Sequence, residues 1–157
     1  RGDKFLKFGV DMVISGYTGE EVREILTNAI ESTFGRNTVQ VDILRSMGGA
    51  APAFGMIGTL VGLIIMLDNL GGDPTLLGAG LAVALLTTLY GVMFARMIFI
   101  PAATKIQQRE EIVRFRNYLI AEGLSLLADK KNPRYIADRM NSFLDPAIHF
   151  NIDKMKR

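Results

Sequence analysis

The feature that most constrains this chain is a fifty-residue segment, 46–95, that contains no lysine or arginine. Its only carboxylates, Asp68 and Asp73, lie near its middle and separate two uncharged stretches, 46–67 and 74–95. Each stretch has 22 residues. A helix of about 20 apolar residues is long enough to cross the hydrocarbon core of a bilayer. The segment therefore predicts a membrane hairpin of two helices.

The charges of the chain are segregated around this hairpin. All 18 basic residues lie before residue 46 or after residue 95. Since lysine and arginine gather on the cytoplasmic side of membrane proteins, both flanks are expected in the cytoplasm. We therefore expect a cytoplasmic helical region at 1–45, a membrane hairpin at 46–104 with an external turn at 68–75, and cytoplasmic helices at 105–157.

Several classes of function are disfavoured by composition. The chain has no cysteine and one histidine, His149, so thiolate sites and histidine-based metal sites are not expected. No nucleophile with a base is visible, which disfavours an intramembrane enzyme. We expect no cofactor and no nucleic-acid partner. The chain begins at Arg1 without a methionine, and we expect part of the protein to precede it.

The region before the hairpin carries a helix-start signal. Thr18 and Glu21 form an S/T-x-x-E capping box, and apolar residues follow at helical spacing. This helix is expected to end near Gly35, because glycine suits a left-handed C-cap. The apolar segment 5–14 before it has an ambiguous period.

The region after the hairpin is expected to continue the second span into the cytoplasm as a charged helix with one apolar side. Asn132 and Pro133 then predict the start of a last helix, 134–144, which Asp145-Pro146 ends. The tail, 153–157, is expected to be frayed. Between the two spans, Asp73 and Pro74 are placed to begin the second membrane helix.

Both spans carry small residues at helical spacing. Gly58 and Gly62 form a small-xxx-small pair that lets another helix approach closely, and Gly55 and Gly91 extend the two small faces. We expect these faces to pack against protein rather than lipid. Ordinary bundle packing explains any single glycine equally well, and we expect further helices or neighbouring copies to cover the faces.

Polar side chains inside the spans are few: Thr59, Thr87 and Thr88. Hydroxyl oxygens can ligate a hard cation or hold water, but they cannot change charge near neutral pH. A titrating ion carrier must then come from another polypeptide. The alternative is that each hydroxyl bonds back to a carbonyl of its own helix.

Two prolines, Pro52 and Pro101, remove the helical donors to the carbonyls of Gly48 and Met97. They predict either ordinary kinks of membrane helices or a pair of hinges near the cytoplasmic end.

The runs 51–63 and 80–91 resemble the third and fourth membrane helices of MotA/PomA flagellar stator subunits, and ExbB/TolQ proteins are wider relatives. The resemblance implies an all-α, four-span subunit of the bacterial inner membrane, in contact with lipid. It also implies a pentamer around two copies of a MotB/PomB-type partner whose aspartate carries the ion. Ion flow would turn the pentamer against a FliG-type rotor protein.

Carried over by motif position, Thr59, Thr87 and Thr88 would line the ion path, and Pro52 and Pro101 would couple ion binding to movement. Thr59 is similar to the sodium-type pattern, and the ion stays open between H+ and Na+. The resemblance implies that the family's main rotor-contact segment lies upstream of this chain. The candidate rotor contacts within it are four charged residues: Arg23, Glu24, Glu31 and Arg36.

Two other functions remain as alternatives. An ExbB/TolQ-type energiser of an envelope system would use similar physics with a different output. A pore-forming hairpin of the kind found in soluble toxins would need no partner, and soluble monomeric behaviour would favour it.

Overall fold

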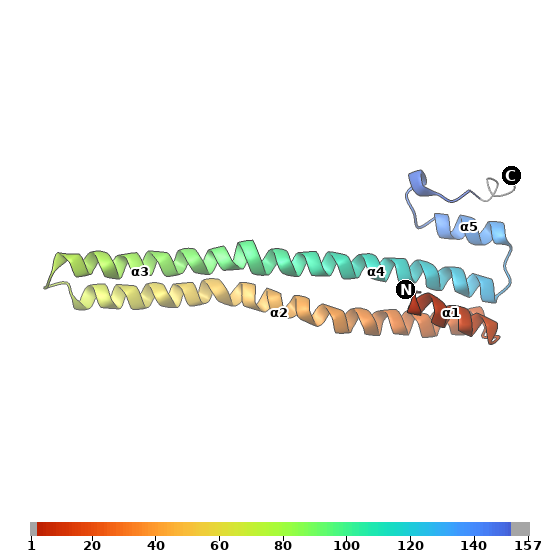
Figure 1. Ribbon diagram of the computed structural model, residues 1–157, viewed down its shortest axis with the longest axis horizontal. Helices are drawn as coiled ribbons and strands as arrows, with labels where there is room; N and C mark the ends of the chain where they lie inside the picture. The colour runs from red at the N-terminus through yellow and green to blue at the C-terminus, as the bar shows by residue number, and fades with distance from the viewer. Residues whose placement is uncertain (1–2, 152–157) are drawn as a thin grey trace. The chain divides into compact units, whose positions relative to one another are not determined.

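The computed structural model describes residues 3–151, so the predicted frayed tail lies outside the described part. The described chain contains helices and no strand, which confirms the all-α prediction (Figure 1). The elements in order are α1 (Lys4–Ile14), α2 (Gly19–Asp68), α3 (Pro74–Met93), the π-helical turn η1 (Phe94–Phe99), α4 (Ile100–Ala128), α5 (Pro133–Asn141) and the 3-10 turn η2 (Pro146–Ile148).

Helix α2 begins at the predicted capping box. The backbone N–H of Thr18 donates to Glu21 Oε2 at 2.9 Å, and the backbone N–H of Glu21 donates to Thr18 Oγ1 at 3.3 Å. Two N–H groups that the first turn leaves without helical acceptors are thereby satisfied. Gly16, with φ of +86°, supplies the left-handed residue that separates α2 from α1.

The predicted helix end near Gly35 is wrong. Helix α2 continues through this residue and runs without interruption from Gly19 to Asp68. Gly35 is not among the residues with positive φ, so it does not adopt the left-handed C-cap conformation. A single glycine inside a helix costs about 1 kcal/mol relative to alanine. That cost does not end a helix whose flanking turns are packed.

The hairpin tip follows the prediction. The side chain of Asp73 accepts from the backbone N–H of Thr75 at 2.9 Å, and Pro74 is the first residue of α3. Helix α3 passes through η1 directly into α4, which confirms that the second span extends beyond Ala95. The sequence analysis contained no expectation of a π-helical turn.

The last helix starts as predicted and ends early. Asn132 Oδ1 accepts from the backbone N–H of Arg134 at 2.9 Å, but α5 ends at Asn141 rather than at residue 144. The Asn141 side chain both donates to the carbonyl of Phe150 at 2.8 Å and accepts from its N–H at 2.9 Å. This pair of hydrogen bonds fixes the returning chain beside the helix end.

The chain divides into two compact units, residues 1–36 with 110–157, and residues 37–109. The first unit has a buried apolar cluster to which α1, α2 and α4 contribute: Met12, Val22, Leu26, Ile30, Ala121 and Leu124. Gly9 lies against this cluster, where a Cβ atom would come within 3.3 Å of Leu26. The short helix α1 is thus held on the two longer ones.

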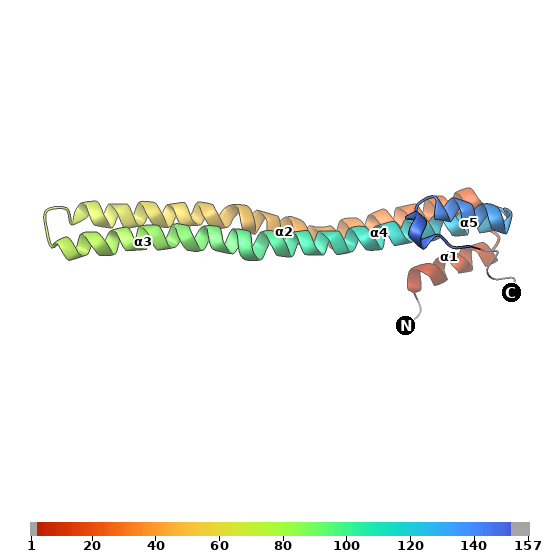
Figure 2. The same ribbon diagram turned by 90° about the horizontal axis from the view of Figure 1, so that it is seen from above.

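In the second unit, α2 runs antiparallel to the continuous helix formed by α3, η1 and the start of α4 (Figures 1 and 2). Small residues occupy the buried positions between them, whereas large apolar side chains such as Phe54, Leu60 and Leu85 are exposed. Both helices are long and apolar enough to cross a membrane. The exposed apolar surface suits a lipid or a protein environment rather than water.

Candidate functional site

The candidate site lies on the seam between α2 and α3, where hydroxyl groups meet a backbone carbonyl. Thr59 Oγ1 on α2 lies 3.1 Å from the carbonyl oxygen of Ala84 on α3. The same hydroxyl lies 3.1 Å from the carbonyl of Gly55 and contacts the hydroxyl of Thr88. The side chain of Thr59 therefore joins the two helices.

The two threonines of α3 share the same acceptor. Thr87 Oγ1 lies 3.0 Å from the carbonyls of both Val83 and Ala84, and Thr88 Oγ1 lies 3.3 Å from that of Ala84. Each hydroxyl has one proton, and a carbonyl oxygen has two lone pairs. The three hydroxyls cannot all donate to Ala84 at once, so the cluster retains oxygen lone pairs.

The geometry agrees with both interpretations of the threonines, as hydroxyls bonded within their own helices and as an oxygen cluster shared between the helices. Each of the three hydroxyls is within hydrogen-bond distance of the carbonyl four residues earlier in its own helix, which is the ordinary arrangement. The contacts of Thr59 with Ala84 and Thr88 are additional and cross the seam. The result is a neutral group of oxygen atoms that can hold water or part of a cation's shell, but cannot titrate.

Glycines on both helices make this approach possible. A Cβ atom on Gly55 would lie 2.8 Å from the carbonyl oxygen of Thr87, and one on Gly62 would lie 2.7 Å from the backbone nitrogen of Ala84. A Cβ atom on Gly58 would meet the side chain of Thr87 at 2.6 Å. The small face of α2 is therefore covered by α3 of the same hairpin, and the faces left open are the ones with large side chains.

An apolar hollow of about 490 Å³ opens beside the seam. Residues of both helices and of η1 line it: Ala51, Phe54, Gly55, Thr87, Tyr90, Gly91, Phe94 and Phe99. Thr87 belongs both to this lining and to the hydroxyl cluster. A helix lying in the hollow would thus reach the neighbourhood of the hydroxyl oxygens.

The two prolines occupy different backbone settings. Pro52 lies inside α2, half-buried, and the helix continues across it. Pro101 is the second residue of α4 and lies two residues after the end of the π-helical turn. In this turn the N–H of Ile100 donates to the carbonyl of Ala95, five residues earlier, instead of four. Only the second proline therefore accompanies a change in helix type.

The four candidate rotor contacts lie in the first unit, and three of them have partners there. Arg23 pairs with Glu122 at 3.2 Å, and the Arg36 guanidinium donates to the Ser32 hydroxyl at 3.0 Å. Glu31 accepts three hydrogen bonds from Arg114, at 2.7, 2.8 and 3.0 Å. The fourth, Glu24, is exposed on α2.

Glu31 belongs to a cluster that sequence reasoning missed. The Arg114 guanidinium lies over the Phe34 ring, 4.5 Å from its centroid, and the Tyr118 hydroxyl also donates to Glu31. These hydrogen bonds, first that from Tyr118 and then those from Arg114, lower the pKa of Glu31 below its usual value. The same contact with Glu31 raises the pKa of Tyr118. The partners are more than 80 residues apart, so no local sequence pattern indicates them.

Two apolar antiparallel helices, joined by glycines and hydroxyl groups, define the hairpin as part of a helical membrane protein. The chain belongs to the MotA/TolQ/ExbB proton channel family, whose sequence profile matches residues 2–118.

Comparison with individual proteins agrees with this assignment. The chain is 40% identical to the chemotaxis protein PomA of Vibrio alginolyticus over 141 residues, which cover 90% of the chain and 55% of that protein. It superimposes on the structure of C. jejuni MotAB with a TM-score of 0.87 at 24% identity, covering 97% of this chain and 60% of that one. For the flagellar MotAB stator complex of Bacillus subtilis the TM-score is 0.82 at 25% identity, covering 98% and 58%. The chain thus spans little more than half the length of these relatives.

Proposed function

We propose that this chain is part of an ion-conducting stator subunit of the bacterial flagellar motor, which couples inward flow of H+ or Na+ to rotation. The observation that carries the proposal is the meeting of Thr59, Thr87 and Thr88 at the Ala84 carbonyl, on the seam of a membrane hairpin. This group offers oxygen atoms within the two uncharged stretches, 46–67 and 74–95. The names of PomA and of the MotAB stator complexes support the motor function.

The ion-carrying acid lies outside this hairpin. Within 46–95 the only carboxylates, Asp68 and Asp73, lie at or beside the tip of the hairpin, and hydroxyl groups cannot bind and release a proton at neutral pH. We infer that a MotB/PomB-type partner supplies an aspartate on a membrane helix. The apolar hollow beside Thr87 has the lining that such a helix requires.

The wider assembly follows from the same proposal. Residues 46–104 would cross the bacterial inner membrane, with 1–45 and 105–157 in the cytoplasm. Five subunits would surround two partner chains, and lipid would contact the outer apolar side chains. Pro52 and Pro101 would act in the coupling of ion binding to movement.

Torque would pass through the cytoplasmic helices to a FliG-type rotor protein. Of the four candidate contacts, Glu24 is exposed, and Arg23, Glu31 and Arg36 would have to exchange their present partners for the rotor. Glu24 is therefore the candidate whose engagement costs least.

A second candidate function is an ExbB/TolQ-type energiser of an envelope system, because the family profile that matches residues 2–118 includes both groups. Deleting the gene separates the two. A stator predicts loss of swimming with normal outer-membrane uptake, and an energiser predicts the reverse.

The direct test is complementation of the deletion strain with this protein and its partner, followed by measurement of swimming speed against Na+ concentration and membrane potential. Replacing the partner's membrane aspartate by asparagine is expected to abolish swimming while the complex still assembles. Normal swimming with the asparagine variant would refute the proposal. A speed that rises with Na+ at fixed potential identifies Na+ as the ion, and a speed that is independent of Na+ identifies H+.

A further inference from the structure

In the second unit, the buried residues of α2 follow a strict seven-residue repeat: Val41, Gly48, Gly55 and Gly62. A repeat of seven corresponds to 3.5 residues per turn, which keeps one stripe of a helix facing a partner helix. No residue is added or lost along this stripe, although Pro52 lies within it. The spacing of residues on the opposite helix can therefore be compared with this regular seven-residue repeat.

Over the same length, the opposite helix contains one residue more than α2. Gly91 faces Gly55, since a Cβ atom on Gly91 would lie 3.1 Å from Gly55 Cα. Gly48 lies against Phe99 and Ile100: a Cβ atom on Gly48 would lie 3.0 Å from Ile100 Cγ1, near the end of that side chain, and 3.5 Å from the Cβ atom of Phe99. Seven residues separate Gly55 from Gly48, whereas eight separate Gly91 from Phe99. The two helices remain in contact on both sides of this extra residue.

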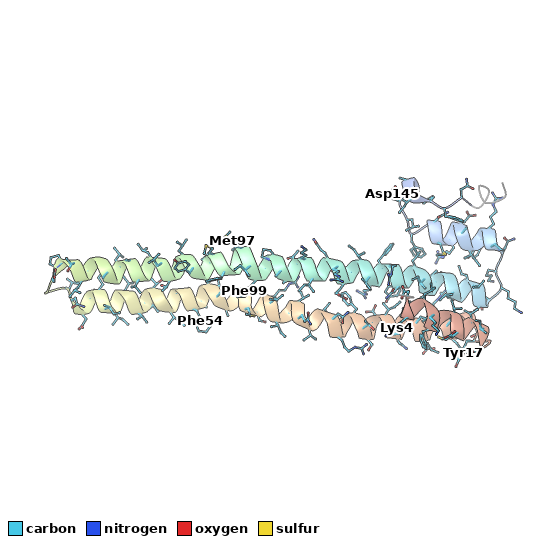
Figure 3. The ribbon with its side chains drawn as sticks, in the orientation of Figure 1. Lys4, Tyr17, Phe54, Met97, Phe99 and Asp145 are labelled. Atoms are coloured by element: carbon cyan, nitrogen blue, oxygen red, sulfur yellow. The ribbon has the colours of Figure 1, made fainter. Side chains whose placement is uncertain are left out.

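A regular α-helix cannot absorb an extra residue on one face. Each residue turns the helix by about 100°, so an insertion would rotate everything after it away from α2. The extra residue lies where η1 replaces the α-helix over Phe94–Phe99, and the wider π turn holds one more residue without that rotation. Figure 3 shows Met97 on the side away from α2 and Phe99 on the side toward it, and Met97 is 70% exposed.

Pro101 favours the π form of this turn. In an α-helix the carbonyl of Met97 would accept from the N–H of residue 101, and proline has none. In an α-helix the ring of Pro101 would also clash with that carbonyl, and the wider π turn, in which the N–H of Ile100 donates to Ala95, relieves the clash. The proline therefore favours the same helix type that the extra residue requires.

We propose that η1 is a register element of the hairpin: it holds one extra residue, so that α3 and the start of α4 both stay in contact with the seven-residue repeat of α2. Conversion of the turn to α-helix would rotate α4 relative to α3 by about 100° and shift it by about 1.5 Å. The turn is thus a defined place where the helix can change phase by one residue.

The test uses cysteine cross-linking in bacterial membranes containing the protein and its partner, because the chain has no cysteine of its own. Gly48→Cys with Phe99→Cys reports the register below the turn. Gly48→Cys with Ile98→Cys reports the neighbouring register, and Thr59→Cys with Thr88→Cys reports that the hairpin has formed. In the full-length protein we expect the 48–99 bond to form at least about tenfold faster than the 48–98 bond, because misplaced cysteines cannot bridge. Equal rates would overturn the proposal.

Length variants sharpen the test. Deletion of Met97 or of Ile98 removes the extra residue, so the 48–99 bond is expected to form at the parental rate. Insertion of one alanine after Met97 adds a second extra residue, and the bond is expected to be lost while the 59–88 bond remains. If both deletions lose the 48–99 bond, or if the insertion keeps it, the proposal is wrong. Should no length variant accumulate, the comparison of the 48–99 and 48–98 bonds in the full-length protein decides.

Discussion

The hydroxyl of Thr59 on α2 contacts the hydroxyl of Thr88 on α3, so that one hydrogen bond between side chains crosses the hairpin seam. Thr59 also reaches the Ala84 carbonyl at 3.1 Å, which Thr88 approaches at 3.3 Å. The positions of these oxygens therefore depend on both helices at once. A change that moves one helix along the other alters the oxygen cluster directly.

Removal of the Thr59 hydroxyl is expected to weaken ion-driven swimming. Thr59→Val keeps the size and branching of the side chain but removes the oxygen, whereas Thr59→Ser keeps the oxygen. One hydrogen-bonding group is worth about 1 kcal/mol, or about fivefold in cation affinity. The Na+ or proton dependence of swimming speed should shift by about that factor in the valine variant. The serine variant should stay close to the parent, and equal behaviour of both variants would contradict the role of the hydroxyl.

Adding a methyl group to the seam is expected to destabilise the hairpin. In Gly91→Ala the new Cβ atom would lie 2.7 Å from the carbonyl oxygen of Ala51, and backbone atoms cannot turn away as side chains can. We expect a loss of about 1–3 kcal/mol, measured as lower heat stability of the detergent-solubilised complex. Gly78→Ala on the same helix is the control, because no atom lies within 4 Å of its Cβ position. Similar losses in both variants would contradict the close packing at Gly91.

The Glu31 cluster is expected to make the first unit, residues 1–36 with 110–157, less stable in acid. The pKa of Glu31 is lowered in the folded state, chiefly by the hydrogen bond from Tyr118 and then by Arg114. The resulting stabilisation is present above the ordinary pKa of 4.5 and is lost as pH falls through the lower folded value. Because Arg114 and Glu31 side chains are 37% and 42% exposed, solvent screens the pair and the effect is small.

The measurement is thermal unfolding of the purified complex as a function of pH. The parent should lose more stability than Glu31→Gln when the solution is acidified below about pH 4.5, since the variant has no carboxylate to protonate. Glu24→Gln, at an exposed position of the same helix, should follow the parent. Parallel pH curves for the parent and the Glu31 variant would show that the cluster does not contribute.

Replacement of Pro101 is expected to shift the register of the hairpin. Pro101→Ala removes the ring that clashes with the Met97 carbonyl in an α-helix, and it adds an N–H that can donate to this carbonyl. The α form of the turn therefore gains about 1 kcal/mol, or about fivefold in population. The 48–98 disulfide should then increase relative to the 48–99 disulfide by about that factor. Pro52→Ala is the matched control, because α2 is α-helical on both sides of it. An unchanged ratio in the Pro101 variant would show that the proline does not hold the turn.

Features set by neighbouring residues were predictable from the sequence. The capping box of Thr18 and Glu21 and the cap formed by Asp73 each depend on atoms a few residues apart. The membrane hairpin was also predictable, since the absence of charge over 46–95 is a property of the whole segment. These signals come from local hydrogen bonds or from the solvation of a whole segment, and both are kept in the folded protein.

Features that depend on distant residues were not predictable. Gly35 has the local appearance of a helix end, but the tertiary packing of α2 overrides this preference. The partners of Glu31 lie far along the chain, and only the folded unit brings Arg114 and Tyr118 to it. The π turn depends on how the second helix matches the spacing of buried residues on the first, and no local sequence pattern at Phe94–Phe99 indicates it.

The carboxylates at the hairpin tip also limit how the hairpin can move. Asp68 and Asp73 are exposed, and any inward displacement along the membrane normal would drag them into hydrocarbon. Outward displacement would do the same to Arg45 and Arg96 at the opposite ends of the spans. In the proposed topology, the charges at both interfaces therefore fix the depth of the hairpin in the membrane, whereas rotation about the membrane normal leaves every charge at its own interface. A hairpin with this charge placement resists displacement along the membrane normal and permits rotation about it.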